Sequence, residues 1–262
     1  MTITRETIIS HIAASMGSED SILALWLEGS DGTGSVDEYS DIDLVCYARA
    51  GCEDEAMARL DACLKQLGDV DLDYEQPGRP VNNRYKVYHL RQTPESLLID
   101  ATIQSESFPV SFIEEDRTVV PVVLVDKAEI VCFRSVDPEE LRAQLLGTVA
   151  EAKAVFGQKS RAEKYTKRGL FLESLIYYHK YVLNPLVDVL RIVHTPLQAD
   201  CFLVHATRDF PDEVTARLEN LYGVRTVREI ADRIALADEL FRRAVVDAEA
   251  MLSGGAFLNR EA

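Results

Sequence analysis

The chain has 262 residues, 47 % of them hydrophobic, and carries 28 Lys and Arg against 44 Asp and Glu, a formal net charge of −16. The hydrophobic share suffices for a buried core and excludes a disordered or fibrous chain. So negative a charge argues against a general nucleic-acid binder and against docking on anionic membranes. Residues 1–150 hold 12 basic and 28 acidic side chains, whereas residues 151–262 hold 16 of each. We therefore expect two domains with different roles.

The cysteines bear on the compartment. There are five, an odd number, and no two form a C-x-x-C pair. This usage favours reduced thiols in a cytoplasmic protein, and the spacing does not suit a structural zinc site. Residues 1–18 do not have the pattern of a signal peptide, and no run of about 18 apolar residues predicts a transmembrane helix.

The first 136 residues alternate between helical and strand patterns. Apolar side chains at spacings of three and four predict a helix from Ile8 to Met16 and another over residues 53–67. Compact apolar runs predict strands over residues 22–27, 42–47, 84–90 and 97–103. Residues 119–125 and 129–133, joined through Asp126-Lys127, favour a hairpin.

The sequence pattern changes at Asp137. This residue precedes Pro138 and two glutamates, an arrangement typical of the start of a helix. Apolar residues then recur at helical spacing to about residue 252. We predict an α/β domain over residues 1–136 and an all-helical domain over residues 137–262. Breaks between helices are expected at Gly157, Pro185, Pro196, Pro211 and Gly223.

One segment carries the pattern of a reactive site. A predicted strand runs into Gly29-Ser30, and after ten intervening residues Asp41-Ile42-Asp43 opens the next strand. Alternation along a strand places both carboxylates on one face, about 6–7 Å apart, where they can share a hard divalent cation. Glycine lets a backbone approach a phosphate closely, and serine adds a hydroxyl and an N–H.

Asp100 extends this pattern. It lies within a later strand between Ile99 and Ala101, where burying a carboxylate is costly unless a metal or donors meet it. A third carboxylate could complete a two-metal site or accept the proton of an attacking hydroxyl. A lone D-x-D is usually a solvated loop, and Gly-Ser after a strand is common turn chemistry. The order of these two motifs in this chain, with Asp100 after them, favours a functional site.

The segment from Gly29 to Asp43 resembles the signature of the nucleotidyltransferase superfamily that includes DNA polymerase beta. The form YSDIDL at residues 39–44 is similar to small antibiotic-modifying adenylyltransferases that act on aminoglycosides and lincosamides. The resemblance covers residues 20–105, and a helical second domain fits the group by architecture only.

The resemblance implies an α+β protein, with a mixed sheet and flanking helices as the catalytic domain and a helical substrate-binding domain. It implies ATP and two Mg²⁺ in a cleft between the domains, with AMP transferred to a hydroxyl and pyrophosphate released. Asp41 and Asp43 would be metal ligands, and Gly29 and Ser30 would hold the phosphates. Asp100 matches the third acidic position, as ligand or as base.

The densest basic stretch lies at the start of the second domain, from Lys153 to Arg168. It favours either a triphosphate contact, for which we nominate Lys164 and Lys167, or a solvated helix face with ion pairs. The aromatic run over residues 177–181 contributes partly to the core, with a role in acceptor binding as the alternative.

Three functions stay open at this point. The first is an ATP- and Mg²⁺-dependent transferase acting on a small molecule, for which an acidic domain suits a cationic acceptor such as an aminoglycoside. The second is a nucleotidyltransferase that modifies a partner protein. The third is a non-catalytic nucleotide-binding module, which the presence of all three carboxylates disfavours. The sequence predicts neither the acceptor nor the oligomeric state.

Overall fold

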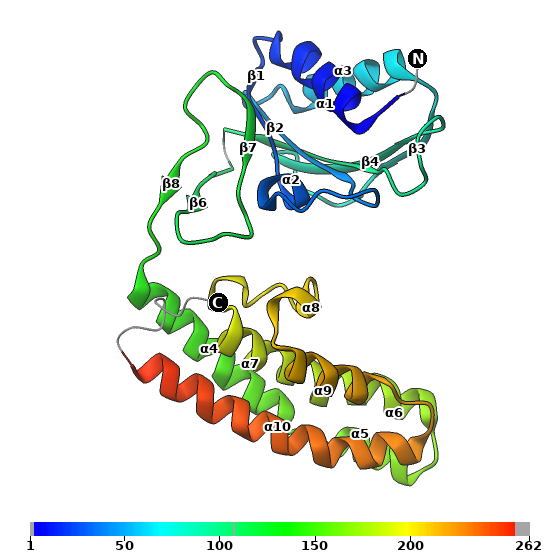
Figure 1. Ribbon diagram of the computed structural model, residues 1–262, viewed down its shortest axis with the longest axis vertical. Helices are drawn as coiled ribbons and strands as arrows, with labels where there is room; N and C mark the ends of the chain where they lie inside the picture. The colour runs from blue at the N-terminus through cyan, green and yellow to red at the C-terminus, as the bar shows by residue number, and fades with distance from the viewer. Residues whose placement is uncertain (1–2, 107, 255–262) are drawn as a thin grey trace. The chain divides into compact units, whose positions relative to one another are not determined.

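The computed structural model describes residues 3–106 and 108–254 and divides the chain into two compact units, Met1–Val136 and Asp137–Ala262 (Figure 1). The first unit is a mixed sheet with helices and the second is all-helical, so the predicted fold class is confirmed. Across the described ranges, no helix has the length and apolar content needed to cross a membrane.

The elements of the first unit are, in chain order, α1 (Arg5–Gly17), β1 (Ile22–Leu27), α2 (Gly29–Thr33), β2 (Ile42–Ala48), α3 (Glu53–Leu67), β3 (Val70–Glu75), β4 (Asn83–Leu90), β5 (Ile99–Ser105), β6 (Phe112–Ile113), β7 (Val122–Asp126) and β8 (Phe133–Arg134). Those of the second unit are α4 (Pro138–Phe156), α5 (Ser160–Lys167), α6 (Phe171–Tyr178), the π-helix η1 (His179–Leu183), α7 (Asn184–His194), the 3₁₀ helix η2 (Pro196–Gln198), α8 (Ala206–Asp209), α9 (Asp212–Tyr222) and α10 (Val227–Ser253).

Six strands form the main sheet, in the order β3-β4-β5-β2-β1-β7. The central pair, β2 and β5, is parallel, and the other neighbours are antiparallel. The parallel pair needs a crossover, which α3 and the β3–β4 hairpin provide. Strands β6 and β8 form a separate two-stranded parallel sheet.

One face of the main sheet is covered by α1 and α3, which lie on the same side of it (Figure 1). The strands alternate accordingly: along β5, Ile99, Ala101 and Ile103 are buried toward these helices, whereas Asp100 and Thr102 on the opposite face are half-buried. The helix-covered core joins side chains of α1, α3 and four strands, among them Ile8, Ile12, Met16, Leu60, Leu64, Ile42, Leu44 and Tyr88. The opposite face carries a smaller buried apolar cluster that includes Trp26, Val45, Tyr47 and Phe112, and it also carries the half-buried Asp43 and Asp100.

The predicted hairpin at Asp126-Lys127 is wrong. Strand β7 pairs with β1, with Leu27 opposite Val122, while β8 pairs with β6. The Asp126 carboxylate accepts hydrogen bonds from the backbone N–H groups of Ile130 and Val131 at 2.9 and 3.0 Å. These bonds close a turn that leads the chain away from β7, so the two apolar runs join different sheets.

Two further elements differ from expectation. The polar segment that begins at Gly29 starts with a short helix, α2, which the sequence did not predict. Strand β3 was not predicted; it is an edge strand whose residues are exposed except for the half-buried Val70. Its apolar side chains alternate with acidic ones over residues 70–75, a period-two pattern that could have identified it.

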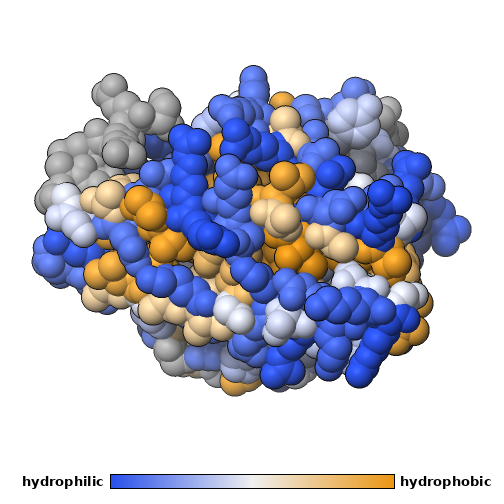
Figure 2. All heavy atoms as spheres, turned by 90° about the horizontal axis from the view of Figure 1, so that it is seen from below, coloured by the Kyte–Doolittle hydropathy of each residue, from blue (hydrophilic) through white to orange (hydrophobic). Residues whose placement is uncertain are grey.

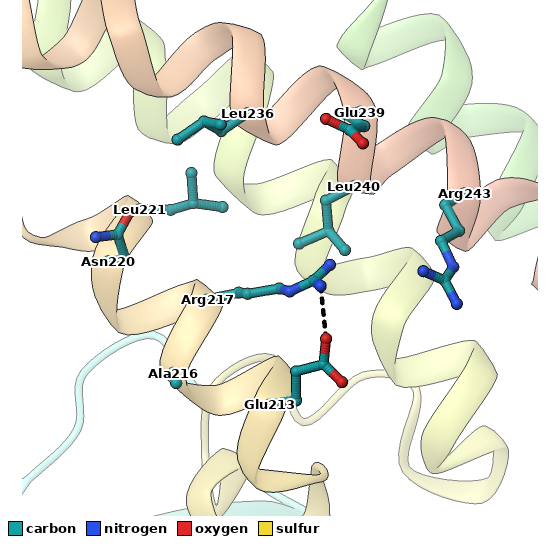
Figure 3. A pocket seen from close by; sticks show the side chains of 9 residues that line it. All are labelled: Glu213, Ala216, Arg217, Asn220, Leu221, Leu236, Glu239, Leu240 and Arg243. Atoms are coloured by element: carbon teal, nitrogen blue, oxygen red, sulfur yellow. Dashed lines mark hydrogen bonds and ion pairs between the residues drawn. The ribbon is translucent and has the colours of Figure 1, made fainter.

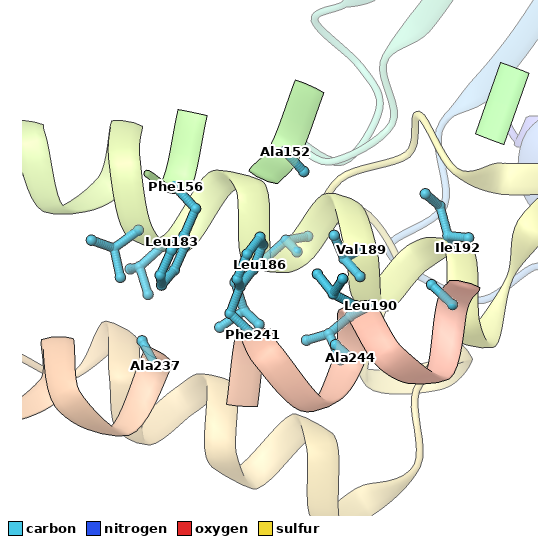
Figure 4. Packing of buried hydrophobic residues seen from close by; sticks show 14 of the residues in the cluster. Ala152, Phe156, Leu183, Leu186, Val189, Leu190, Ile192, Ala237, Phe241 and Ala244 are labelled. Carbon is cyan, nitrogen blue, oxygen red and sulfur yellow. The ribbon is translucent and has the colours of Figure 1, made fainter. Parts of the chain in front are cut away.

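The helical unit has its own core, built mainly by α4, α7 and α10 (Figure 4). At its centre the rings of Phe156 and Phe241 stack, with centroids 3.9 Å apart. The break predicted at Pro185 does not occur, because Pro185 lies in the first turn of α7, directly after the π-helical turn η1. Proline has no backbone N–H to donate to the preceding turn. The wider π-helical turn at this point tolerates the missing hydrogen bond, so the helix continues.

Candidate active site

Asp43 and Asp100 lie side by side on the face of the sheet opposite α1 and α3. They are directly opposite one another in the parallel register of β2 and β5, and Asp41 lies just before β2. Carboxylate oxygens of the three residues all lie within 4.8 Å of one another. The structure therefore brings together the three carboxylates that the sequence predicted as a cluster, in a spacing that can hold a metal ion.

The cluster is electrostatically unfavourable by itself. Burial, followed by the neighbouring charges of Asp41 and Asp100, raises the pKa of Asp43 to about 6. Burial also raises the pKa of Asp100, against the lowering effect of a hydrogen bond from Tyr85. One oxygen of Asp100, Oδ1, is buried and has no partner among the described residues. Hard oxygen donors that repel one another and are incompletely satisfied fit a divalent cation such as Mg²⁺.

Gly29 and Ser30 lie beside these carboxylates, at the turn from β1 into α2. Gly29 has a φ of +58°, and a Cβ built on it would lie 2.0 Å from Oδ2 of Asp43. A side chain at this position would therefore occupy the place of the carboxylate. The hydroxyl oxygen of Ser30 is buried without a hydrogen-bond partner in the described part of the chain. The turn thus presents close backbone and a free hydroxyl next to the acidic cluster.

Arg5, which the sequence did not predict, joins three parts of this site. From the first residue of α1 its guanidinium donates to Oδ1 of Asp31 in α2 at 2.9 Å, and it also pairs with the second oxygen of Asp31. It donates as well to the backbone oxygen of Asp41 at 2.9 Å. A planar guanidinium suits such a fork. Arg5 thereby fixes the turn at Gly29 relative to the segment that carries the carboxylates.

Two other residues near the carboxylates were also missed. Tyr85 reaches Asp100 from β4, and burial together with that carboxylate raises the pKa of the Tyr85 phenol to about 12. Glu28 accepts a hydrogen bond from the indole N–H of the buried Trp26 at 2.7 Å. Neither residue belongs to a sequence motif. Tyr85 comes near Asp100 only through the pairing of β4 with β5, so no local sequence pattern identifies it.

Lys164 and Lys167 lie in the helical unit, on α5. Three tyrosines of this unit stack in a column: the ring centroids of Tyr165 and Tyr177 are 5.0 Å apart, and those of Tyr177 and Tyr181 are 5.6 Å apart. Lys164 lies over Tyr165 at 4.8 Å from the ring centroid. Three more cations lie over the two outer rings: Arg161, Arg168 and Lys180.

These four cations and Lys167 are alike in their lack of ion pairs among the described residues. Over residues 3–106 and 108–254 none of them has an acidic partner within ion-pair distance, although acids outnumber bases in the chain. The neighbouring Lys153 and Lys159, in contrast, pair with Glu249 and Asp238. The basic stretch is thus not one salt-bridged helix face: Arg161, Lys164, Lys167 and Arg168 present charges with no acidic partner among the described residues, as does Lys180 in η1. Contact of Lys164 and Lys167 with a nucleotide stays a prediction.

Comparison with known proteins gives structural likenesses to solved chains. No family model and no curated protein matches the chain. Among solved structures, the fold is similar to that of an aminoglycoside 6-adenyltransferase from Bacillus subtilis, with a TM-score of 0.40 and 12 % sequence identity. The alignment covers 96 % of this chain and 92 % of that one. The chemistry open to this chain follows from its own residues.

Proposed function

We propose that this chain is a Mg²⁺-dependent nucleotidyltransferase that transfers AMP from ATP to a hydroxyl group of a small molecule and releases pyrophosphate. The observation that carries the proposal is the cluster of Asp41, Asp43 and Asp100, with oxygens within 4.8 Å, beside the turn at Gly29 and Ser30. Paired carboxylates next to a close backbone turn are suited to a metal-bound phosphate.

The three carboxylates would hold the metal, as one or two Mg²⁺ ions. When bound, Mg²⁺ neutralises triphosphate charge and favours the departure of pyrophosphate. The protein's part is to keep three mutually repelling carboxylates in one place, which β2 and β5 achieve through their register and Arg5 through its bond to the Asp41 backbone.

Gly29 and Ser30 would bind the phosphates. The missing side chain at Gly29 leaves room directly over Asp43, so an anion and its cation can approach together. The hydroxyl of Ser30, which has no partner within the described residues, is free to donate to a phosphate oxygen.

Asp100 can act as a metal ligand or as the base that accepts the proton of the acceptor hydroxyl, and one variant separates the two roles. With Tyr85 on one side of the carboxyl, the unpartnered Oδ1 is the atom available for either role. If Asp100 is the base, Asp100→Asn loses transfer but keeps the Mg²⁺-dependent affinity for ATP. If Asp100 is a ligand, the same variant loses both.

Lys164 and Lys167 are proposed to contact the triphosphate. The support is that neither lysine has an acidic partner among the described residues, although the chain holds 44 acids. The neighbouring Lys153 and Lys159, in contrast, are paired. Cations left without a partner keep their full charge for an anionic ligand. The stacked tyrosines hold Lys164 over a ring, which restricts its motion.

For the acceptor, we propose a cationic hydroxyl compound of the aminoglycoside class, with lincosamides as the alternative. The support is the YSDIDL form of residues 39–44 and the acidic excess of residues 1–150, which raises the local concentration of cations. An enzyme with this activity would confer resistance to the antibiotic it modifies.

The test is release of pyrophosphate from ATP and Mg²⁺ across a panel of aminoglycosides, lincosamides and neutral polyols, with mass spectrometry of the adenylylated product. We expect release with at least one cationic compound and none without acceptor. Asp43→Asn should abolish it, whereas Glu38→Gln, at an exposed residue of the neighbouring loop, should not. Absence of release with every compound, despite ATP binding, would contradict the proposed acceptor class.

A further inference from the structure

A groove lies between α9 and α10 of the helical unit, and none of the residues that line it belongs to the proposed site. It encloses about 480 Å³, and leucines from both helices line it: Leu221, Leu236 and Leu240. In Figure 3 the side chain of Arg217 extends from α9 toward Leu240, and its ion pair with Glu213 is drawn. A second hollow of about 140 Å³, which shares Leu240 and Arg217 with the first, continues the groove toward α7. One flank of α10 is therefore not packed against its own unit.

The outward surface of α10 carries a regular stripe. Its members follow one another at alternating spacings of four and three residues, and every one of them is exposed: Asp232, Leu236, Glu239, Arg243, Val246 and Ala250. None of them belongs to the buried core, to which α10 contributes residues such as Phe241. Leu236 and Val246 are 48 % and 64 % exposed. Figure 2 shows apolar side chains among hydrophilic ones on one face of the molecule. Alternation of four and three is the spacing of a coiled-coil seam.

This outer stripe is complementary to itself in one orientation. Position 241 is its midpoint, so an antiparallel copy of α10 centred there places Leu236 opposite Val246 and Glu239 opposite Arg243. Asp232 then faces Ala250. A parallel copy would instead place each charged residue opposite its own kind. A two-fold interface requires a surface that matches itself under rotation, and the antiparallel arrangement meets that condition.

Net charge also favours this surface. Residues 137–262 hold 17 basic and 19 acidic side chains, whereas residues 1–136 hold 11 and 25. Two copies of the chain repel one another through their acidic first units. They can approach without that penalty through the nearly neutral helical unit, whose groove has two arginines and two glutamates on its walls.

We propose that two copies of this chain associate through the outer stripe of α10, antiparallel about a two-fold axis near residue 241, so that each copy covers Leu236, Glu239 and Arg243 on the wall of the other's α9–α10 groove. The apolar pair Leu236–Val246 and the ion pair Glu239–Arg243 each occur twice in this arrangement. The loose contact of Arg243 with Asp247, at 3.9 Å, leaves the guanidinium free to change partner. The proposal does not depend on the enzymatic function.

The first experiment measures the mass of the full chain by sedimentation velocity over a range of concentrations. We expect a concentration-dependent dimer that Leu236→Arg weakens at least about tenfold in Kd, because a buried contact is lost at the interface. The matched control is Leu172→Arg, at a leucine of α6 that is 73 % exposed and lies outside the stripe; it should leave the dimer unchanged. A wild-type chain that remains monomeric up to about 100 µM would overturn the proposal.

The second experiment identifies the contact and its direction. Glu239→Arg and Arg243→Glu each place like charges opposite one another in the antiparallel dimer, so each variant alone should be weakened. Mixed together, they restore both ion pairs, and native mass spectrometry should show the mixed dimer in excess over both homodimers. A mixture without this excess would refute the assigned pairing even if the wild type dimerises.

One alternative occupant of the groove is a small amphipathic molecule. An environment-sensitive apolar dye would reveal it: a monomeric chain that binds the dye, with binding lost in Leu236→Arg, would overturn the proposal in its favour. In the proposed dimer, dye binding should fall as the chain concentration rises, because the second copy covers Leu236, Glu239 and Arg243, which line the groove.

Discussion

Asp43 and Asp100 face each other across the one parallel strand pair of the six-stranded sheet, although 57 residues separate them in the chain. Their carboxylates share one small region with that of Asp41, and burial raises the pKa of both. Removing one of these charges should have opposite effects on catalysis and on the stability of the metal-free fold.

Asp43→Asn is therefore expected to abolish transfer while the metal-free protein becomes more stable. The amide cannot replace an anionic ligand, but it relieves repulsion from Asp41 and Asp100. Because Asp43 is only partly buried, solvent screening limits the gain to about 1 kcal/mol. Urea unfolding in EDTA measures the gain, and pyrophosphate release measures the loss. Near-normal turnover in this variant would remove Asp43 from the proposed metal site.

The charge of Asp43 should also affect how the stability of the fold depends on pH. The Asp43 carboxyl has a pKa of about 6 in the folded chain, above the value of about 3.9 in an unfolded one. Its contribution to stability is therefore complete below pH 3.9 and lost as the pH rises through 6. Without metal, the wild type should lose stability relative to Asp43→Asn between these values, as followed by thermal unfolding. Added Mg²⁺ should reverse this difference at pH 7. Parallel curves with and without Mg²⁺ would contradict the metal site.

Gly29→Ala should disrupt the turn beside the carboxylates. Its φ of +58° is unfavourable for alanine, and the new Cβ would collide with Asp43. We expect a loss of more than about 1 kcal/mol in unfolding free energy and little or no transfer. Gly34→Ala is the matched control, since Gly34 has a φ of +68° and no atom within 4 Å of an added Cβ. If both variants lose the same stability and activity, strain alone explains the effect and the close approach to Asp43 does not.

Arg5→Lys tests whether a forked donor is required to hold the site together. Lysine keeps the charge but cannot bond both oxygens of Asp31 and the Asp41 carbonyl in one plane. We expect a fall in kcat of about tenfold or more with a smaller change in KM for ATP, because the carboxylates lose their fixed position. Arg59→Lys, in a long 3.4 Å ion pair with Glu19, should change neither. A KM effect alone would instead indicate that Arg5 contributes to ATP binding.

Lys164→Gln should weaken ATP binding without changing the fold. If the ammonium contacts the triphosphate, the KM for ATP should rise about tenfold, an effect that high salt reduces in the wild type. Lys153→Gln removes a lysine of the same basic stretch that is already paired with Glu249, and should leave KM unchanged. Equal effects from the two variants would favour a general contribution of charge over a contact.

Local sequence patterns predicted the elements whose formation depends on residues close together in the chain. The periodicity over residues 53–67 predicted α3 with its bounds, and Asp137 is the helix cap that its sequence context indicated. The D-x-D alternation gave Asp41 and Asp43 a common face. The pairing of β7 with β1 and the reach of Arg5 across 26 residues to Asp31 depend on the tertiary fold, and no sequence window contains them. The same reason hid Tyr85, which the β4–β5 register places by Asp100.

Because of the register of β5, the number of residues in this strand affects both the fold and the site. Ile99, Ala101 and Ile103 point into the helix-covered core because Asp100 and Thr102 point the other way. Inserting or deleting one residue within this strand would turn Asp100 toward α1 and α3 and expose the isoleucines, so fold and site would fail together. Length variation during evolution or engineering is therefore expected in the loops at residues 34–40 and 76–82, and not at Asp41 or in β2 or β5.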